Sequence, residues 1–177
     1  MKAGILVATT ILFSVIGCAT LLEKRLQPTA RLNQYGVFSP TVEPGVPTDT
    51  IFKDIDYVSN PKLLTLTTRI PCRLGTRFGV LFDLDGLPED GITKTLTVRW
   101  DFPEMLSPTG RKVTSSTFTS PIGATKENWK DLYFDWGLEE DFELVSGNWT
   151  ISVYYEDMMM LQQVFVVEGC KQETKKP

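Results

Sequence analysis

The side chains best able to do chemistry in this sequence are carboxylates, because the 177 residues include no histidine. This absence excludes a Ser-His-Asp triad, a Cys-His dyad and a His-ligated zinc site. Asp83 and Asp85, followed by Gly86, could supply alternate oxygen ligands to a cation, as in a calcium loop. Pro88 breaks the later spacing of such a loop, so an acidic turn between strands is the alternative interpretation.

A second acidic group surrounds Glu139, Glu140 and Asp141. Paired carboxylates about 5–10 Å apart in a cleft could hydrolyse a glycosidic bond. A solvated loop is the simpler interpretation of this group. We therefore expect no enzymatic activity, no metal and no cofactor.

Aromatic and methionine side chains are the other candidates for contact with a ligand or partner. Trp129 is out of phase with its apolar neighbours, which makes it the candidate for an exposed ring that stacks on a sugar, whereas Trp100 and Trp149 lie in phase with core positions. Met158 and Met159 fall at an expected hairpin tip, where thioethers can make adaptable apolar contacts. They are the candidates for contact with a partner.

The N-terminal segment is typical of an export signal. Lys2 precedes an uncharged stretch over residues 3–22, and a basic start followed by an apolar core marks a secretory signal. The sequence Val15-Ile16-Gly17-Cys18 resembles the lipobox of bacterial lipoproteins. This resemblance implies cleavage before Cys18, diacylglycerol on its sulfur and acylation of its amine. An uncleaved transmembrane anchor, an ordinary secreted protein and a buried core helix remain as alternatives.

The same resemblance predicts an address in the cell envelope. Three acyl chains would hold the protein stably on a membrane, since one chain alone binds only marginally. Ala19 stands where an aspartate would signal retention in the inner membrane, which favours the outer membrane, facing the periplasm. Cys72 and Cys170 are then an even number in an oxidising compartment and could form a disulfide, or either thiol could be free.

The sequence pattern predicts that the candidate residues are positioned by β-strands. Residues 18–33 are expected to form the lipidated cysteine and a flexible tether, and residues 39–48 a loose stretch rich in proline. Between and after them, apolar residues alternate with polar ones in short segments separated by turn residues. The expected strands span residues 34–38, 64–70, 78–82, 95–100, 113–119, 132–136, 149–155 and 164–167. Residues 1–17 are assigned to the signal, 34–170 to the folded domain and 171–177 to a polar tail.

Seven or eight short strands joined by polar turns predict an all-β antiparallel sandwich of immunoglobulin-like type. Tyr35-Gly36-Val37-Phe38, Gly147-Asn148-Trp149-Thr150-Ile151-Ser152-Val153 and Val164-Phe165-Val166-Val167 resemble motifs in a bacterial family of uncharacterised envelope proteins. The resemblance covers about residues 34–168 and implies the fold alone.

Charge narrows the class of partner. The formal net charge is −4, with 18 basic and 22 acidic residues, which argues against binding to nucleic acid. The sequence therefore predicts a membrane-anchored envelope lipoprotein that binds or scaffolds another envelope protein without catalysis. A carbohydrate- or cation-binding module and a carboxylate-based glycan hydrolase are the alternatives.

Overall fold

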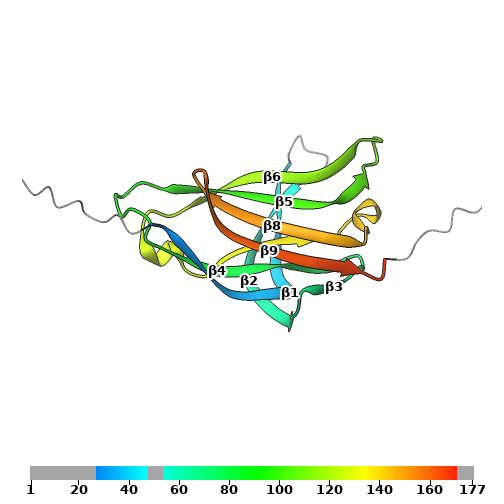
Figure 1. Cartoon of the computed structure of the whole chain (residues 1–177), viewed down its shortest axis with the longest axis horizontal. Helices are drawn as coiled ribbons and strands as arrows, with labels where there is room; N and C mark the ends of the chain where they lie inside the picture. Colours follow the sequence, from blue (N-terminus) through cyan, green and yellow to red (C-terminus); the bar gives the residue numbers. More distant parts are fainter. Residues whose placement is uncertain (1–26, 48–53, 171–177) are drawn as a thin grey trace, which may run out of the picture.

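The computed structural model describes residues 27–47 and 54–170, with side chains for 27–43 and 58–170. Two sheets stack face to face in this part of the chain (Figure 1). Sheet A has the strand order β2-β1-β4-β7, and sheet B has the order β3-β9-β8-β5-β6. All neighbours are antiparallel except β3 and β9. The predicted β-sandwich is confirmed.

The elements have the following bounds: β1 Thr29–Pro47, β2 Asp54–Leu66, β3 Arg69–Pro71, β4 Arg77–Asp85, β5 Lys94–Leu106, β6 Lys112–Ile122, η1 Lys126–Trp129, β7 Leu132–Gly137, η2 Asp141–Glu143, β8 Gly147–Tyr155 and β9 Met158–Glu168. The two η elements are single 3₁₀ turns.

Aromatic side chains fill the core between the sheets. On β5 the residues from Leu96 to Trp100 alternate between buried and partly exposed positions, as a strand with one solvated face requires. Phe78 of β4 lies at the centre, with edge-to-face contacts to Trp100, Trp149 and Phe165 at ring-centroid distances of 5.5, 5.8 and 5.3 Å. These contacts join the two sheets through the geometry that aromatic rings prefer.

The first strand begins earlier and ends later than the sequence pattern indicated. Residues 29–33, which we assigned to the tether, pair with β4 from Thr29 opposite Asp85 onward. Residues 39–47, which we expected to be loose, continue β1 as a ribbon that pairs with β2 alone. Its register shifts fall at Ser39/Thr41 and Glu43/Val46, where bulges accommodate proline.

The expected strand over residues 64–70 is in fact two strands in different sheets. β2 ends at Leu66 in sheet A, and β3 begins at Arg69 in sheet B. Leu64 and Leu66 are in phase with Ile70 in the sequence, but they are 58% and 61% exposed whereas Ile70 is fully buried. A period of two shows which residues share a face, but it cannot show that the chain changes sheets.

Cys72 and Cys170 form a disulfide across 98 residues of chain. The sheet topology explains why the two cysteines lie close together. Cys72 follows β3, and β3 runs parallel to β9, so the carboxyl ends of both strands lie together. The Cys72 N–H donates to the Glu168 carbonyl at 2.9 Å, which fixes this alignment beside the bridge.

The domain has two distinct ends. The start of β1, the end of β4 and the β8–β9 turn lie at one of them, here called the tether end (Figure 1). The disulfide and the turn before β4 lie at the opposite end. The described residues contain no helix that is long and apolar enough to cross a membrane.

Candidate functional site

Asp83 belongs to the internal framework and not to a ligand site. It is 4% exposed, and its carboxylate accepts hydrogen bonds from Arg31 at 2.6 Å, from Asn33 at 2.9 Å and from the backbone N–H of Asp131 at 3.0 Å. The Arg31 hydrogen bond, ahead of the other partners, lowers the pKa of Asp83 to about 2. The carboxylate thus ties β1, β4 and the start of β7 together and is not accessible to a ligand.

Asp85, the other residue of this candidate pair, is exposed and accepts a hydrogen bond from Lys130 at 2.9 Å. The Lys130 ammonium group also lies 3.8 Å from the Asp83 carboxylate, so a positive charge of the protein itself pairs with both carboxylates. Over residues 27–43 and 58–170, no group of three or more Cys, Asp or Glu side chains is placed to hold a metal ion.

The second acidic group is likewise engaged in structural contacts. Glu143 is 5% exposed and accepts the backbone N–H groups of Glu139 at 2.7 Å and Glu140 at 2.9 Å, as part of a capping box on η2. Asp135 is buried against Arg77 at 2.7 Å, and Arg77 also pairs with Glu139. Carboxylates used in this way are not free to act as a general acid and a nucleophile.

Glu143 makes the stability of the domain sensitive to pH. Burial raises the pKa of its carboxyl, and hydrogen bonds from Glu139 and Glu140 oppose this rise only in part. A raised carboxyl pKa means that the folded state loses stability as pH rises above the unfolded value. Glu143→Gln should therefore make the domain more stable at pH 7, with no gain at pH 4. Urea unfolding at both pH values measures this, and an equal effect at both would contradict it.

Trp129 is fully buried, so the expectation that it is exposed is wrong. The η1 turn folds its ring inward, and its indole N–H donates to the Gly123 carbonyl at 2.7 Å. Asn128 and Lys130 on either side of it are exposed on this single turn. Their polarity led to the prediction that Trp129 is exposed as well. Trp100, Trp136 and Trp149 are also buried, and so none of the four tryptophans offers a ring face for sugar stacking.

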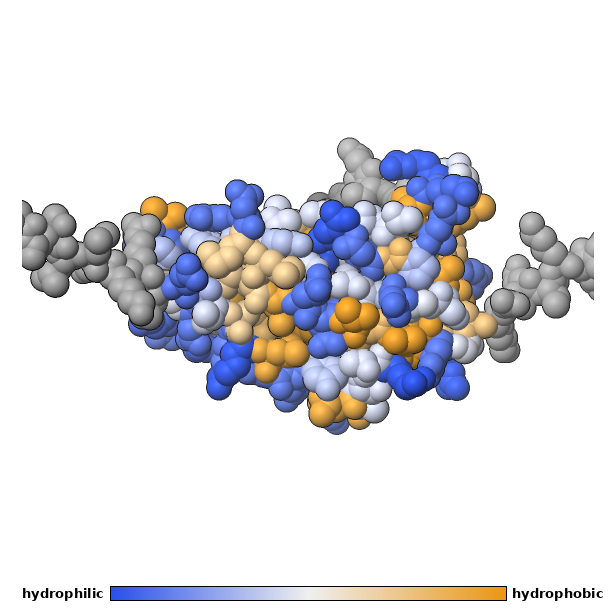
Figure 2. Space-filling model, in the orientation of Figure 1, coloured by the Kyte–Doolittle hydropathy of each residue, from blue (hydrophilic) through white to orange (hydrophobic). Residues whose placement is uncertain are grey.

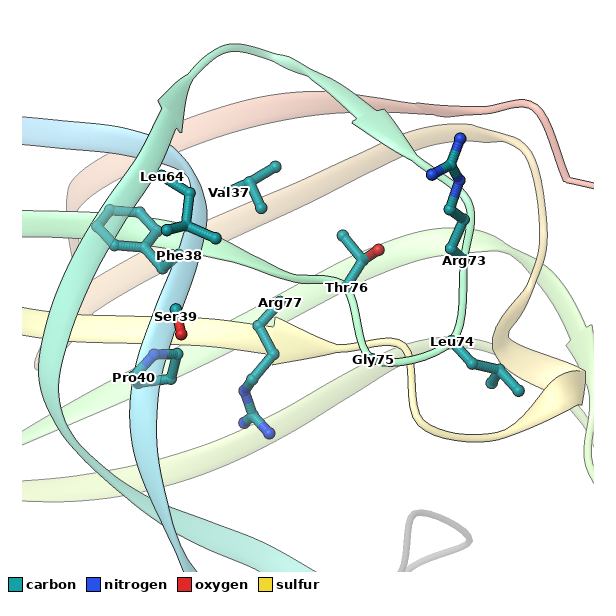
Figure 3. A pocket seen from close by; sticks show the side chains of 10 residues that line it. All are labelled: Val37, Phe38, Ser39, Pro40, Leu64, Arg73, Leu74, Gly75, Thr76 and Arg77. Carbon is teal, nitrogen blue, oxygen red and sulfur yellow. The ribbon is translucent and has the colours of Figure 1, made fainter.

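A shallow groove of about 430 Å³ lies at the disulfide end, between residues 37–40 with Leu64 and the turn at residues 73–77 (Figure 3). The polar side chains of its walls do not point together into the groove. Arg77 is held by Asp135 and Glu139, and the Arg73 and Leu74 side chains point away from Ser39 and Pro40 on the opposite wall. The groove therefore lacks the few directed polar groups that orient a bound small molecule.

Exposed apolar side chains gather on β9 instead. Met158, Met159, Val164 and Val166 are 40%, 52%, 41% and 37% exposed, and residues 158–167 include no charged side chain. Figure 2 shows the resulting apolar surface over the β8–β9 hairpin and along β9. Exposed apolar residues that cluster, and do not occur singly, mark sites of interaction. The structure therefore leaves both predicted methionines accessible and adds two valines.

Strand β8 extends this surface with uncharged residues, whereas on β3 Arg69 lies opposite Val166 and pairs with Glu168 at 2.9 Å. Tyr154 lies opposite Met159, Thr150 opposite Val164 and Asn148 opposite Val166. We call this side of strands β9, β8, β5 and β6 the outer face of sheet B. Its two charged residues on β5, Arg99 and Asp101, neutralise each other at 2.6 Å.

The valines were not among the predicted contact residues, because residues 164–167 were predicted only as the last strand, with no face assigned to each residue. Phe165 and Val167 are buried, whereas Val164 and Val166 point outward. The signal that could have found them is the alternation with Phe165 on the last strand, where every second residue must face solvent.

Comparisons with known proteins agree with this architecture. A family model described as a domain of unknown function (DUF3859) matches residues 26–167. An immunoglobulin-like protein from Pseudomonas aeruginosa, known from its crystal structure, is similar with a TM-score of 0.58 and 20% sequence identity, over 82% of this chain and 99% of that one. The predicted immunoglobulin-like fold is therefore confirmed. No curated protein matches the sequence.

Proposed function

The chain belongs to the family of the domain of unknown function DUF3859, and we propose that it is a non-enzymatic binding module, anchored by lipid in the bacterial cell envelope. The observation that supports this function best is the outer face of sheet B. It combines exposed Met159, Val164 and Val166 with charges that neutralise each other in two ion pairs, Arg99–Asp101 and Arg69–Glu168.

The chemistry of this face suits a protein partner. Contact surfaces between proteins are depleted in charge at their centre and enriched in aromatic residues and methionine. Tyr154 opposite Met159 and the two valines on β9 form such a centre, and Thr150 beside them can donate and accept hydrogen bonds. Methionine is flexible enough to adapt to the shape of a partner. We infer that another envelope protein binds here.

The anchor follows from the lipobox-like sequence before Cys18. Thr29, the first residue of β1, is about ten residues from Cys18, so the linking chain reaches at most about 40 Å. The tether end of the domain would then stay near the membrane, with the outer face of sheet B accessible from the side. Ala19 after the cysteine supports placement on the outer membrane, facing the periplasm.

The test is site-specific photocrosslinking in intact cells that make the full-length protein. A photoreactive amino acid at Val164 should yield an adduct with one identifiable envelope protein. Val166→Glu in the same chain should reduce that adduct at least tenfold, because a carboxylate would lose its hydration in the contact with the partner.

Ile92 provides the matched control, since it is 62% exposed and apolar but lies between β4 and β5 outside this face. The photoreactive residue at Ile92 should give no such adduct, and Ile92→Glu should leave the Val164 adduct unchanged. Equal adducts at the two positions, or none at Val164, would refute binding by the outer face of sheet B.

A further inference from the structure

Among the residues that the structure describes, strand β6 pairs only with β5 and is therefore an open edge of sheet B. The alternation of hydrogen bonds shows which backbone groups are open. On the side of the sheet opposite β6, the Val166 N–H of β9 points away from β8 and donates to the Thr68 carbonyl. Successive residues of a strand direct their backbone N–H and C=O groups to opposite sides, and the regular pairs between β9, β8, β5 and β6 carry this order across the sheet. On β6, the N–H and C=O groups of Thr117 and Thr119 therefore face away from β5, toward solvent.

Pro121 supports the same assignment. It lies two residues after Thr119 and opposite Thr95, so its nitrogen, which carries no hydrogen, also faces the open edge. Proline occurs in edge strands in this orientation, where no ladder hydrogen bond is lost.

The β6 edge carries one feature that opposes pairing, Pro121 near its end, and lacks the others. Residues 113–122 contain no charged side chain, and the pairing with β5 is regular from Ser115 to Ile122. Natural edge strands are usually protected by charge, proline, bulges or short length. The other described edges show such protection: β2 has three register shifts against β1, β3 has three residues and β7 has six.

The sequence of β6 is symmetric about Phe118, with Thr117 and Thr119 next to it and Ser116 and Ser120 beyond. Two identical strands that pair antiparallel are related by a two-fold axis, so a palindromic sequence places residues of the same type opposite each other. We propose that β6 pairs antiparallel with β6 of a second copy of this chain, with the two Phe118 residues opposite each other.

In this register the open backbone groups of Thr117 and Thr119 meet their complements, whereas Pro121, opposite Ser115 of the second copy, supplies no N–H. Thr117 lies opposite Thr119 of the second copy, and both carry their N–H and C=O groups on the open edge. Phe118 is partly buried and contacts the Phe134 ring at 6.0 Å, so a second Phe118 would extend the core across the joint. Aromatic and threonine cross-strand pairs are favourable, and no like charges oppose each other between residues 114 and 122.

The pairing also sets the orientation of the two copies. Antiparallel strands place the two tether ends at opposite ends of the joined sheet. If both copies are anchored in one membrane, the sheet must lie along its surface. The pairing itself uses the β6 edge and does not depend on the lipid or on the partner proposed for the outer face.

Cysteine crosslinking tests both the partner and the register. Differently tagged full-length chains carrying Thr117→Cys or Thr119→Cys are produced together, oxidised in isolated membranes and separated without reducing agent. Residues in a hydrogen-bonded antiparallel pair have Cα atoms about 5.5 Å apart, within the range of a disulfide. The mixed 117–119 disulfide should form at least tenfold more than either homodisulfide.

Thr97→Cys, one strand inward on β5, serves as the control and should not crosslink to Thr117→Cys above background. No mixed disulfide above this control would overturn the proposal, as would a Thr117→Cys homodisulfide of equal yield. Disulfides formed only with a different protein would assign the edge to that protein and also overturn it.

A charge on the edge provides an independent measurement. Thr117→Lys should convert the detergent-extracted protein to a monomer in sedimentation equilibrium, whereas Thr65→Lys on exposed β2 should not. A wild-type protein that is monomeric at every concentration tested would contradict the pairing.

Discussion

Replacing Cys72 and Cys170 together with alanine should lower the free energy of unfolding by about 4–5 kcal/mol. The bridge closes 98 residues of chain, and in the chain-entropy account a loop of this length restricts the unfolded state by about that amount. A loss of this size is a large part of the stability of an ordinary domain, about 5–15 kcal/mol. The short β3 strand should also detach from β9, since it is held by three paired residues beside the bridge.

Urea unfolding followed by tryptophan fluorescence measures this effect. The wild-type protein in the presence of a reductant should unfold at the same midpoint as the double variant, since both lack the same bridge. A free energy of unfolding for the double variant within about 1 kcal/mol of that of the oxidised wild type would contradict the prediction.

Asp83→Asn should lower the free energy of unfolding at pH 7 by about 2 kcal/mol. The substitution keeps the size of the side chain but removes the charge that Arg31 and the Asp131 N–H stabilise. The pKa of Asp83 falls from 3.8 to about 2 in the folded state, and each unit corresponds to about 1.4 kcal/mol. Because this pKa is lowered by folding, the contribution is present above pH 4 and is lost as pH falls toward 2.

Unfolding at a series of pH values between 2 and 7 therefore distinguishes this charge effect from a simple packing defect. The difference between the wild type and Asp83→Asn should shrink toward zero at the acidic limit. Asp101→Asn is the matched control, because its ion pair with Arg99 is 42–49% exposed and should contribute less than about 1 kcal/mol. A loss for Asp83→Asn that is independent of pH would contradict the account.

Much of the sandwich could be predicted from the sequence because one face of each strand is solvated. Thr95 to Trp100 and Trp149 to Tyr155 alternate cleanly, and both segments are strands in sheet B. The switch between sheets at Thr67 and Thr68 could not be predicted, because alternation carries no information about which sheet a strand joins.

The candidate site was predictable in part for a similar reason. Met158 and Met159 are apolar at a turn, where burial is limited, and both are exposed. The prediction that Trp129 is exposed was wrong because a single 3₁₀ turn buries one side chain without any periodic pattern in the sequence. The structural role of Asp83 could not be predicted, because its partner Arg31 is 52 residues away in sequence and comes close only through the pairing of β1 with β4.

The most direct test of a lipid-anchored module is the intact mass of the protein extracted from native membranes without a reductant. The account predicts a chain that begins at Cys18, carries the mass of several acyl groups and lacks two hydrogens because of the Cys72–Cys170 bridge. An unmodified chain that begins at Met1 or Ala19 would contradict the anchor and favour a transmembrane or secreted protein.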